Sequence, residues 1–121
     1  MVTLKLNKYN LICSLLLFSG QNDPSWEIEY TDDLERIRSI IDSAKEIEKE
    51  ISRNSKLGYH GVSIKSEAGL YLIFNGIIEC FEKNNPGKIL QDKDRKLEIL
   101  LLNLSKEKFN DLITNILQTE F

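Results

Sequence analysis

The chain has 121 residues, with 16 Lys plus Arg, 19 Asp plus Glu and a formal net charge of −3. Its hydrophobic fraction of 41% and charged fraction of 29% exclude a disordered, collagen-like or coiled-coil chain. The acidic balance argues against nucleic acid as a partner and favours a basic protein.

The chain opens with an alternating apolar pattern, and a nearly continuous apolar run follows. Residues 2–7 alternate apolar and polar side chains, which predicts a strand with one solvated face. Residues 9–18 are almost wholly apolar and end at Ser19 and Gly20, which predicts a central strand covered on both faces. The end of this run is a poor cleavage site for a signal peptide, and no stretch is long enough to span a bilayer. We therefore expect a cytoplasmic protein without a membrane partner.

After a turn at residues 21–24, the sequence predicts a short strand with one apolar and one acidic face. Three large apolar residues, Trp26, Ile28 and Tyr30, alternate with the two carboxylates Glu27 and Glu29. Successive side chains of an extended segment point to opposite faces. The glutamates are therefore expected on the solvated side.

The strongest periodicity in the chain predicts a helix that begins at Thr31 or Asp32. Apolar residues recur every three or four positions as far as Ile51, as on the buried face of an amphipathic helix. Asp32 and Glu35 have the spacing of a capping box. We expect this helix to end near Arg53.

Three strands are predicted in the middle of the chain. The first contains Val62, and two β-rich runs follow at residues 70–74 and 77–81. Only Asn75 and Gly76 separate these two runs. This pair is the strongest short signal for a hairpin, because both residues tolerate a positive φ.

Two helices are predicted after a loop at residues 84–87. Asp92 can cap the first helix and Ser105 opens the second, and apolar side chains recur at helical spacing in both. The order of strands, helix, strands and helices predicts a single α+β domain over residues 1–121. We expect a mostly antiparallel sheet with the helices packed on one face.

The reactive residue types form no catalytic or metal-binding pattern. Cys13 and Cys80 lie in apolar runs and are expected to be buried free thiols, unless neighbouring strands bring them together as a disulfide. His60, the one histidine, is interpreted as a turn residue rather than a general base. Two Cys and one His are too few for a closed zinc site, and no phosphate-binding loop is present. We expect no catalytic residue, cofactor or metal.

Charge is distributed unevenly along the sequence. Residues 23–50 carry ten acids and four bases, a net charge of −6, against +3 for the remainder. We interpret this stretch as a surface that captures a basic protein, because charge steers association and aromatic side chains serve as anchors. An ordinary solvated helix face, with Trp26 in the core, is the alternative. The candidate surface consists of Trp26, Glu27, Glu29, Tyr30, Asp32, Asp33 and Glu35.

Two classes of function follow from these patterns. The first is a non-enzymatic binding protein, such as an immunity or inhibitor protein that neutralises a basic toxin or enzyme. The alternative is a small enzyme or small-molecule-binding protein with a pocket near Trp26, Tyr59, His60 and Arg95. A homodimer formed through an edge strand is a third interpretation.

Several short motifs occur in the order found in a known family. They are Phe18-Ser19-Gly20, Pro24-Ser25-Trp26, Gly58-Tyr59-His60-Gly61, Phe74-Asn75-Gly76 and the helical set Asp92, Arg95, Leu97, Glu98, Leu101 and Leu102. Together they resemble an uncharacterised family of small bacterial proteins with the signature Phe-Ser-Gly-Arg-Pro-Asn-Pro-x-Trp. Gln21 and Leu100 stand where that family has Arg and Trp. The resemblance spans most of residues 11–104 and implies architecture more than function.

Overall fold

An antiparallel sheet of six strands forms the base of the molecule. The computed structural model describes residues 11–17, 23–28, 31–48, 59–66, 69–82, 85–106 and 109–121. The strands are β1 (Leu11–Leu15), β2 (Ser25–Ile28), β3 (Val62–Lys65), β4 (Gly69–Phe74), β5 (Ile77–Glu82) and β6 (Asn85–Gln91). Their order in the sheet is β2-β1-β3-β4-β5-β6, with every neighbouring pair antiparallel.

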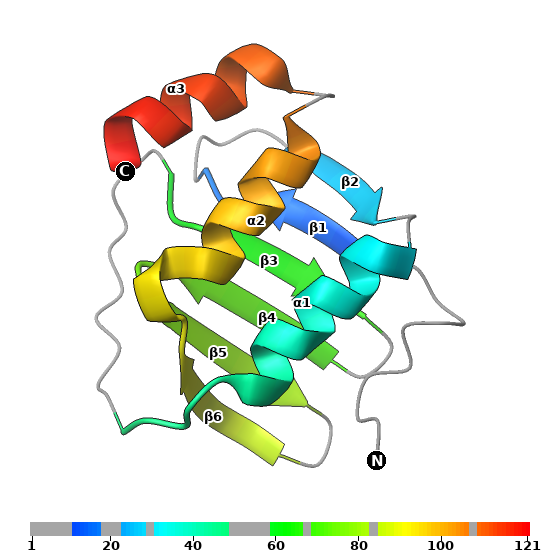
Figure 1. Cartoon of the computed structure of the whole chain (residues 1–121), viewed down its shortest axis with the longest axis vertical. Helices are drawn as coiled ribbons and strands as arrows, with labels where there is room; N and C mark the ends of the chain where they lie inside the picture. The colour runs from blue at the N-terminus through cyan, green and yellow to red at the C-terminus, as the bar shows by residue number, and fades with distance from the viewer. Residues whose placement is uncertain are drawn as a thin grey trace.

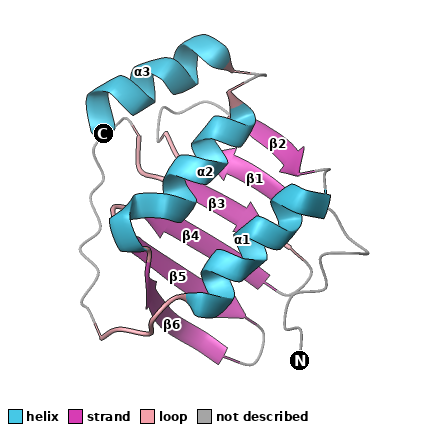
Figure 2. Ribbon diagram, in the orientation of Figure 1, coloured by secondary structure: helices cyan, strands magenta, loops and turns pink. Residues whose placement is uncertain are grey.

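Helices cover one face of this sheet. They are α1 (Thr31–Ser43), α2 (Lys96–Ser105) and α3 (Asn110–Glu120), and a short 3-10 turn, η1 (Lys93–Arg95), leads into α2. Figure 1 shows α1 and α2 lying across the sheet, and α3 packs beside α2 at one end of the molecule. Figure 2 separates the helix layer from the strand layer. The predicted α+β fold, with a sheet covered by helices on one face, is confirmed.

Strand β1 lies between β2 and β3 in the sheet, and the described helices cover only one of its faces. Leu11, Cys13 and Leu15 are buried under the helices, whereas Ile12 points to the opposite face and is 42% exposed. The expectation of a strand covered on both faces is therefore wrong. A continuous apolar run is compatible with a strand covered on one face or on both. In the structure, all the described helices lie on the same side of the sheet (Figure 1).

The hairpin predicted at Asn75 and Gly76 joins β4 to β5. Phe74 pairs with Ile77 across it, and the two turn residues have φ angles of 52° and 86°. Two positive φ angles are what a two-residue hairpin of this kind requires.

The chain continues into β6 where the sequence predicts a loop. The strand includes residues 85–87, and Pro86 pairs with Phe81 next to a register shift in β5. Proline is tolerated here because β6 lies at the edge of the sheet. The loop prediction is thus wrong for residues 85–87.

The helix α1 is shorter than its periodicity predicts, since it ends at Ser43 rather than near Arg53. The residues that follow run along the edge of β6, where the Ile47 amide donates to the Ile89 carbonyl at 2.9 Å. The Gln91 amide likewise donates to the Lys45 carbonyl at 2.8 Å. The backbone therefore covers an open sheet edge in place of continuing the helix. The part of the predicted helix beyond residue 48 lies outside the residues that the structure describes.

The core lies between the sheet and the helices. The α1 residues Leu34, Ile37 and Ile41 are buried, as are Ile113 and Ile116 of α3. From α2 and the sheet, the core also takes Leu97, Leu101, Leu102, Val62, Ile64, Tyr71, Ile73, Ile78 and Leu90. The apolar stripes predicted for α1 and α3 therefore supply the packing that holds both helices in place.

The two cysteines lie in one row across the sheet, with β3 and β4 between them. Cys13 pairs with Ile64, Ile64 with Tyr71, and Tyr71 with Cys80. Three strand spacings place the two residues about 14 Å apart, beyond the roughly 7 Å that a disulfide allows between Cα atoms. Both are free and buried. Burial raises the pKa of Cys13 to about 12, and burial together with the Glu82 carboxylate raises that of Cys80 to about 11.

We expect neither thiol to react with Ellman's reagent in the native protein, because the thiolate is the reactive form and both thiols are buried and protonated. After unfolding in guanidinium without reductant, both thiols of Cys13 and Cys80 should titrate. Reaction of either cysteine in the native state at the rate of a free thiol would contradict its burial. Absence of titratable thiol in the unfolded chain would contradict the free state.

Candidate functional site

The residues of the predicted acidic surface lie in different environments. Trp26 is 4% exposed and packs edge-to-face against Phe109, with 6.2 Å between ring centroids, so it belongs to the core. Glu27 is exposed on the face of the sheet opposite Trp26. Asp32 and Glu35 are exposed on α1. Glu29 and Tyr30 lie outside the described residues.

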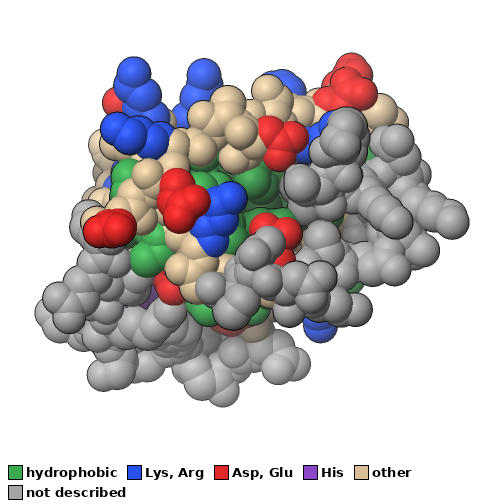
Figure 3. Space-filling view, turned by 90° about the horizontal axis from the view of Figure 1, so that it is seen from below, with side chains coloured by type: hydrophobic (Ala, Val, Ile, Leu, Met, Phe, Trp, Pro, Cys, Tyr) green, Lys and Arg blue, Asp and Glu red, His purple; other side chains and the backbone are tan. Residues whose placement is uncertain are grey.

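An excess of acidic side chains remains on α1 and the segment after it. Residues 31–48 contain six acids and three bases. Two of the bases form ion pairs within the helix. Arg36 Nη2 lies 2.6 Å from Asp33 Oδ1, and Arg38 Nε lies 3.5 Å from Asp42 Oδ2. Figure 3 shows Asp and Glu side chains beside Lys and Arg on the described part of the surface seen from below. Asp32, Glu35 and Asp42 are the exposed carboxylates on α1 itself.

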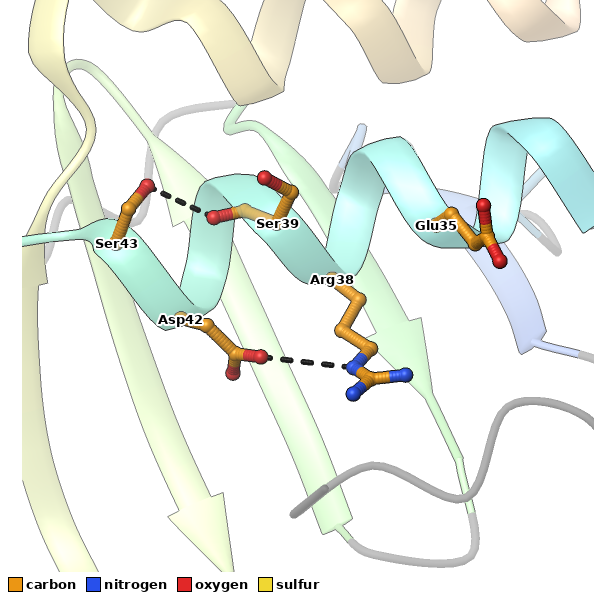
Figure 4. Close-up of a pocket in the computed structure, with 5 residues that line it drawn as sticks. All are labelled: Glu35, Arg38, Ser39, Asp42 and Ser43. Carbon is orange, nitrogen blue, oxygen red and sulfur yellow. Dashed lines mark hydrogen bonds and ion pairs between the residues drawn. The ribbon is translucent and has the colours of Figure 1, made fainter. Parts of the chain in front are cut away.

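An open hollow of about 460 Å³ lies along α1. Its described lining consists of Glu35, Arg38, Ser39, Asp42 and Ser43 (Figure 4). These residues follow the i, i+3, i+4, i+7, i+8 spacing of one helix stripe. Of these five residues the sequence predicted only Glu35 as part of a binding surface, although the helical spacing of the other four polar residues is visible in the sequence.

Carboxylates also surround the strands beneath α1. Tyr71 on β4 has its pKa raised by burial, and the negative charges of Glu82 and Asp42 add to the shift. The pKa of Cys80 is raised by burial, by Glu82 and by Glu46, while Lys88 lowers it. Groups on two neighbouring strands thus experience the acids of α1 and of the segment that follows it.

A second polar cluster lies where β4 and β5 meet the start of α2. The Glu98 carboxylate is 0% exposed. It accepts hydrogen bonds from the Tyr59 hydroxyl, from the Asn75 amide at 2.9 Å, and from Arg95 Nε and Nη2 at 3.0 and 2.8 Å. Both carboxylate oxygens are therefore bonded, as a buried charge requires. Burial and the neighbouring Glu98 charge raise the pKa of Tyr59.

Arg95 is held by contacts on several sides. Its backbone and that of Asp94 have positive φ angles of 55° and 57°, which non-glycine residues adopt rarely. The guanidinium carbon lies 5.8 Å from the Phe74 ring centroid and 4.0 Å from that of Phe121. Arg95 Nη1 donates to the Glu120 carbonyl at 3.1 Å. The arginine thus connects the start of α2 to the end of α3.

Asp92 fixes the first turn of α2, as predicted. It is buried, and its two carboxylate oxygens accept from the backbone amides of Leu97 at 2.8 Å and Glu98 at 3.1 Å. Burial raises the pKa of Asp92 above its ordinary value, although the two hydrogen bonds act in the opposite direction.

The structure assembles three of the four residues of the predicted small-molecule pocket. Tyr59 and His60 lie beside the Phe74 ring, at centroid distances of 5.8 and 6.1 Å, and Arg95 lies over the same ring. Trp26 is at the other end of α2, against Phe109. A ten-residue helix separates these ends by roughly 15 Å. The four residues therefore do not line one pocket.

The described residues hold no group of three or more His, Cys, Asp or Glu side chains placed to bind a metal. None of their helices is long and apolar enough to cross a membrane. Comparison with protein-family models, curated proteins and solved structures finds no match for the chain. The resemblance of its motifs to a bacterial family stays a prediction. Five residues of those motifs are joined by hydrogen bonds in one cluster: Tyr59, Asn75, Asp92, Arg95 and Glu98.

We expect Glu98→Gln to lower the free energy of unfolding by about 3–5 kcal/mol, because the amide leaves the Arg95 charge without its partner. Urea denaturation followed by circular dichroism measures the change. Asp111→Asn is the matched control, since Asp111 is an exposed acid in the first turn of α3. A loss for Glu98→Gln no larger than that of the control would contradict a structural role for the buried charge.

The raised pKa of Asp92 predicts a pH dependence with a definite sign. When the folded-state pKa lies above the unfolded one, the folded state binds the proton more tightly. The contribution of Asp92 to stability is therefore largest at acid pH and declines as pH rises through the interval between the two values. Asp92→Asn lacks this titration. We expect the free-energy advantage of the wild type over this variant, measured by urea denaturation, to shrink as the pH rises above the unfolded-state pKa of about 3.9. An advantage that grows with pH would contradict the raised pKa of Asp92.

Proposed function

We propose that the chain is a non-enzymatic binding protein that captures a basic protein through the outer surface of α1. The observation that supports this proposal is the set of exposed carboxylates on one helix, Asp32, Glu35 and Asp42. Exposed charges of one sign accelerate the association of an oppositely charged partner and fix its orientation. A compact protein of this kind suits an inhibitor or immunity protein that covers a basic toxin or enzyme.

The helix α1 presents these carboxylates on a rigid support. Its opposite face is anchored by the buried Leu34, Ile37 and Ile41, so little conformational entropy is lost when a partner binds. Trp26 is in the core and does not provide the aromatic anchor. The contact therefore depends on charge, and we expect it to weaken steeply with salt.

The alternative, a small-molecule pocket at Tyr59, His60 and Arg95, has less support. The Tyr59 hydroxyl and three nitrogens of Arg95 are already bonded to Glu98 and Glu120. A ligand that used these groups would have to replace contacts with a buried carboxylate. A partner that binds the exposed carboxylates of α1 does not have to replace contacts with a buried charge.

We expect reversal of Asp32 and Glu35 to Lys to abolish capture of a basic partner from a lysate of the cells that make the protein, because the charge that attracts the partner is inverted. Partners retained by the tagged protein at low salt and released at high salt are identified by mass spectrometry. The matched control reverses Asp111 and Glu120, two exposed acids of α3. Equal capture by both double variants, or no basic protein retained by the wild type, would refute the proposal.

A further inference from the structure

The face of the sheet opposite the helices, which we call the open face, carries large apolar side chains. Of the four large apolar residues that are exposed in the described part of the chain, three lie on this face. Ile12 is 42% exposed, and Leu70 and Phe81 are each 37% exposed. The partly exposed apolar residues on the same face are Leu72, Ile77 and Ile89. The solvated face of an antiparallel sheet is ordinarily polar, and an apolar patch there is typical of a protein interface.

The strand register places the three exposed residues in one row. Lys65 pairs with Ile12 on one side and with Leu70 on the other. Leu70 in turn pairs with Phe81. Neighbouring strands lie about 4.8 Å apart, so the row extends for roughly 14 Å across β1, β3, β4 and β5. The described helices all lie on the other side of the sheet (Figure 1), and none of them covers this row.

The charges on the open face suit a second copy of the same face. The exposed Lys65 on β3 and the half-buried Glu79 on β5 lie on either side of β4. A two-fold axis that passes over β4 exchanges these two sides, because such an interface pairs the same patch on both subunits. Lys65 of each copy then faces Glu79 of the other, while Leu70 lies close to the axis and contacts Leu70 of the other copy. Opposite charges across an interface fix its register.

The acidic surface of α1 does not oppose this association. Asp32, Glu35 and Asp42 lie on α1, which is on the other side of the sheet from the open face (Figure 1). Sheets that pack face to face lie about 10 Å apart, and each helix layer adds roughly 10 Å. The two α1 surfaces are therefore about 30 Å apart, well beyond the screening length of about 8 Å at physiological ionic strength. A basic protein, by contrast, is attracted to α1 rather than to the open face.

We propose that two copies of the chain associate through the open face. Five strand spacings and a strand of six residues give this face dimensions of roughly 24 Å by 20 Å. Two such faces would bury about 1,000 Å² in total, which is the lower limit for a specific interface. The dimer is therefore weak, with a dissociation constant of about 10–100 µM. It leaves both α1 surfaces accessible to other proteins.

Sedimentation equilibrium of the full chain tests the proposal over a concentration range that brackets this constant. We expect the mean mass of the wild type to rise from 14.0 kDa toward twice that value. Leu70→Lys should weaken association at least about tenfold, because it brings two positive charges together at the axis and removes apolar contact. Gln118→Lys, the matched control, adds the same charge at an exposed position of α3 and should associate as the wild type does.

An exchange of charges gives a second measurement that does not depend on Leu70. Lys65→Glu should weaken association about threefold to tenfold, because the two-fold axis makes the contact twice, and adding Glu79→Lys to this variant should restore it. Circular dichroism checks that each variant is folded. A wild type that stays at 14.0 kDa at every concentration would overturn the proposal. Unchanged association of the folded Leu70→Lys and Lys65→Glu variants would place the interface elsewhere, such as at the edge strand β2, and would equally overturn it.

Discussion

The buried carboxylate of Glu98 constrains the rest of the structure. A charge without solvent contact must be neutralised and hydrogen-bonded within the protein. Glu98 finds its donors in the neighbouring Arg95 and in two segments distant in sequence. Tyr59 precedes β3, Asn75 forms the turn between β4 and β5, and Arg95 ends η1. Once these donors are in place, the first turn of α2 is fixed to one end of the sheet. The position of α2 then limits where α1 can pack on the same face (Figure 1).

The same constraint accounts for the unusual backbone before α2. Asp94 and Arg95 both adopt positive φ angles, which cost roughly 1–3 kcal/mol each for non-glycine residues. This conformation allows the Arg95 guanidinium to reach Glu98 while its Nη1 reaches the Glu120 carbonyl. The paired charge and the contacts with Phe74 and Phe121 offset the strain. The start of α2 and the end of α3 are thereby joined through one side chain.

Local patterns in the sequence predicted those elements whose cause is local. Asn75 and Gly76 specify their hairpin through backbone preference, and the alternation of Trp26 and Glu27 specifies which face of β2 is buried. The end of α1 at Ser43 was not predictable in this way, because the segment after it pairs with β6, more than forty positions later. The hydrogen bonds from Tyr59 and Asn75 to Glu98 were not predictable for the same reason, because only the folded sheet brings these residues together.

The buried and the exposed carboxylates of the described residues differ in what they contribute to the fold. Glu98 and Asp92 are buried and each accepts at least two hydrogen bonds from the chain. Removing such a group leaves its hydrogen-bond partner buried without a bond, so its loss is expected to lower the free energy of unfolding. Asp32, Glu35 and Asp42 are exposed, and water can replace whatever contacts they make. Substitution of these exposed carboxylates is therefore expected to change the free energy of unfolding much less than substitution of Glu98 or Asp92.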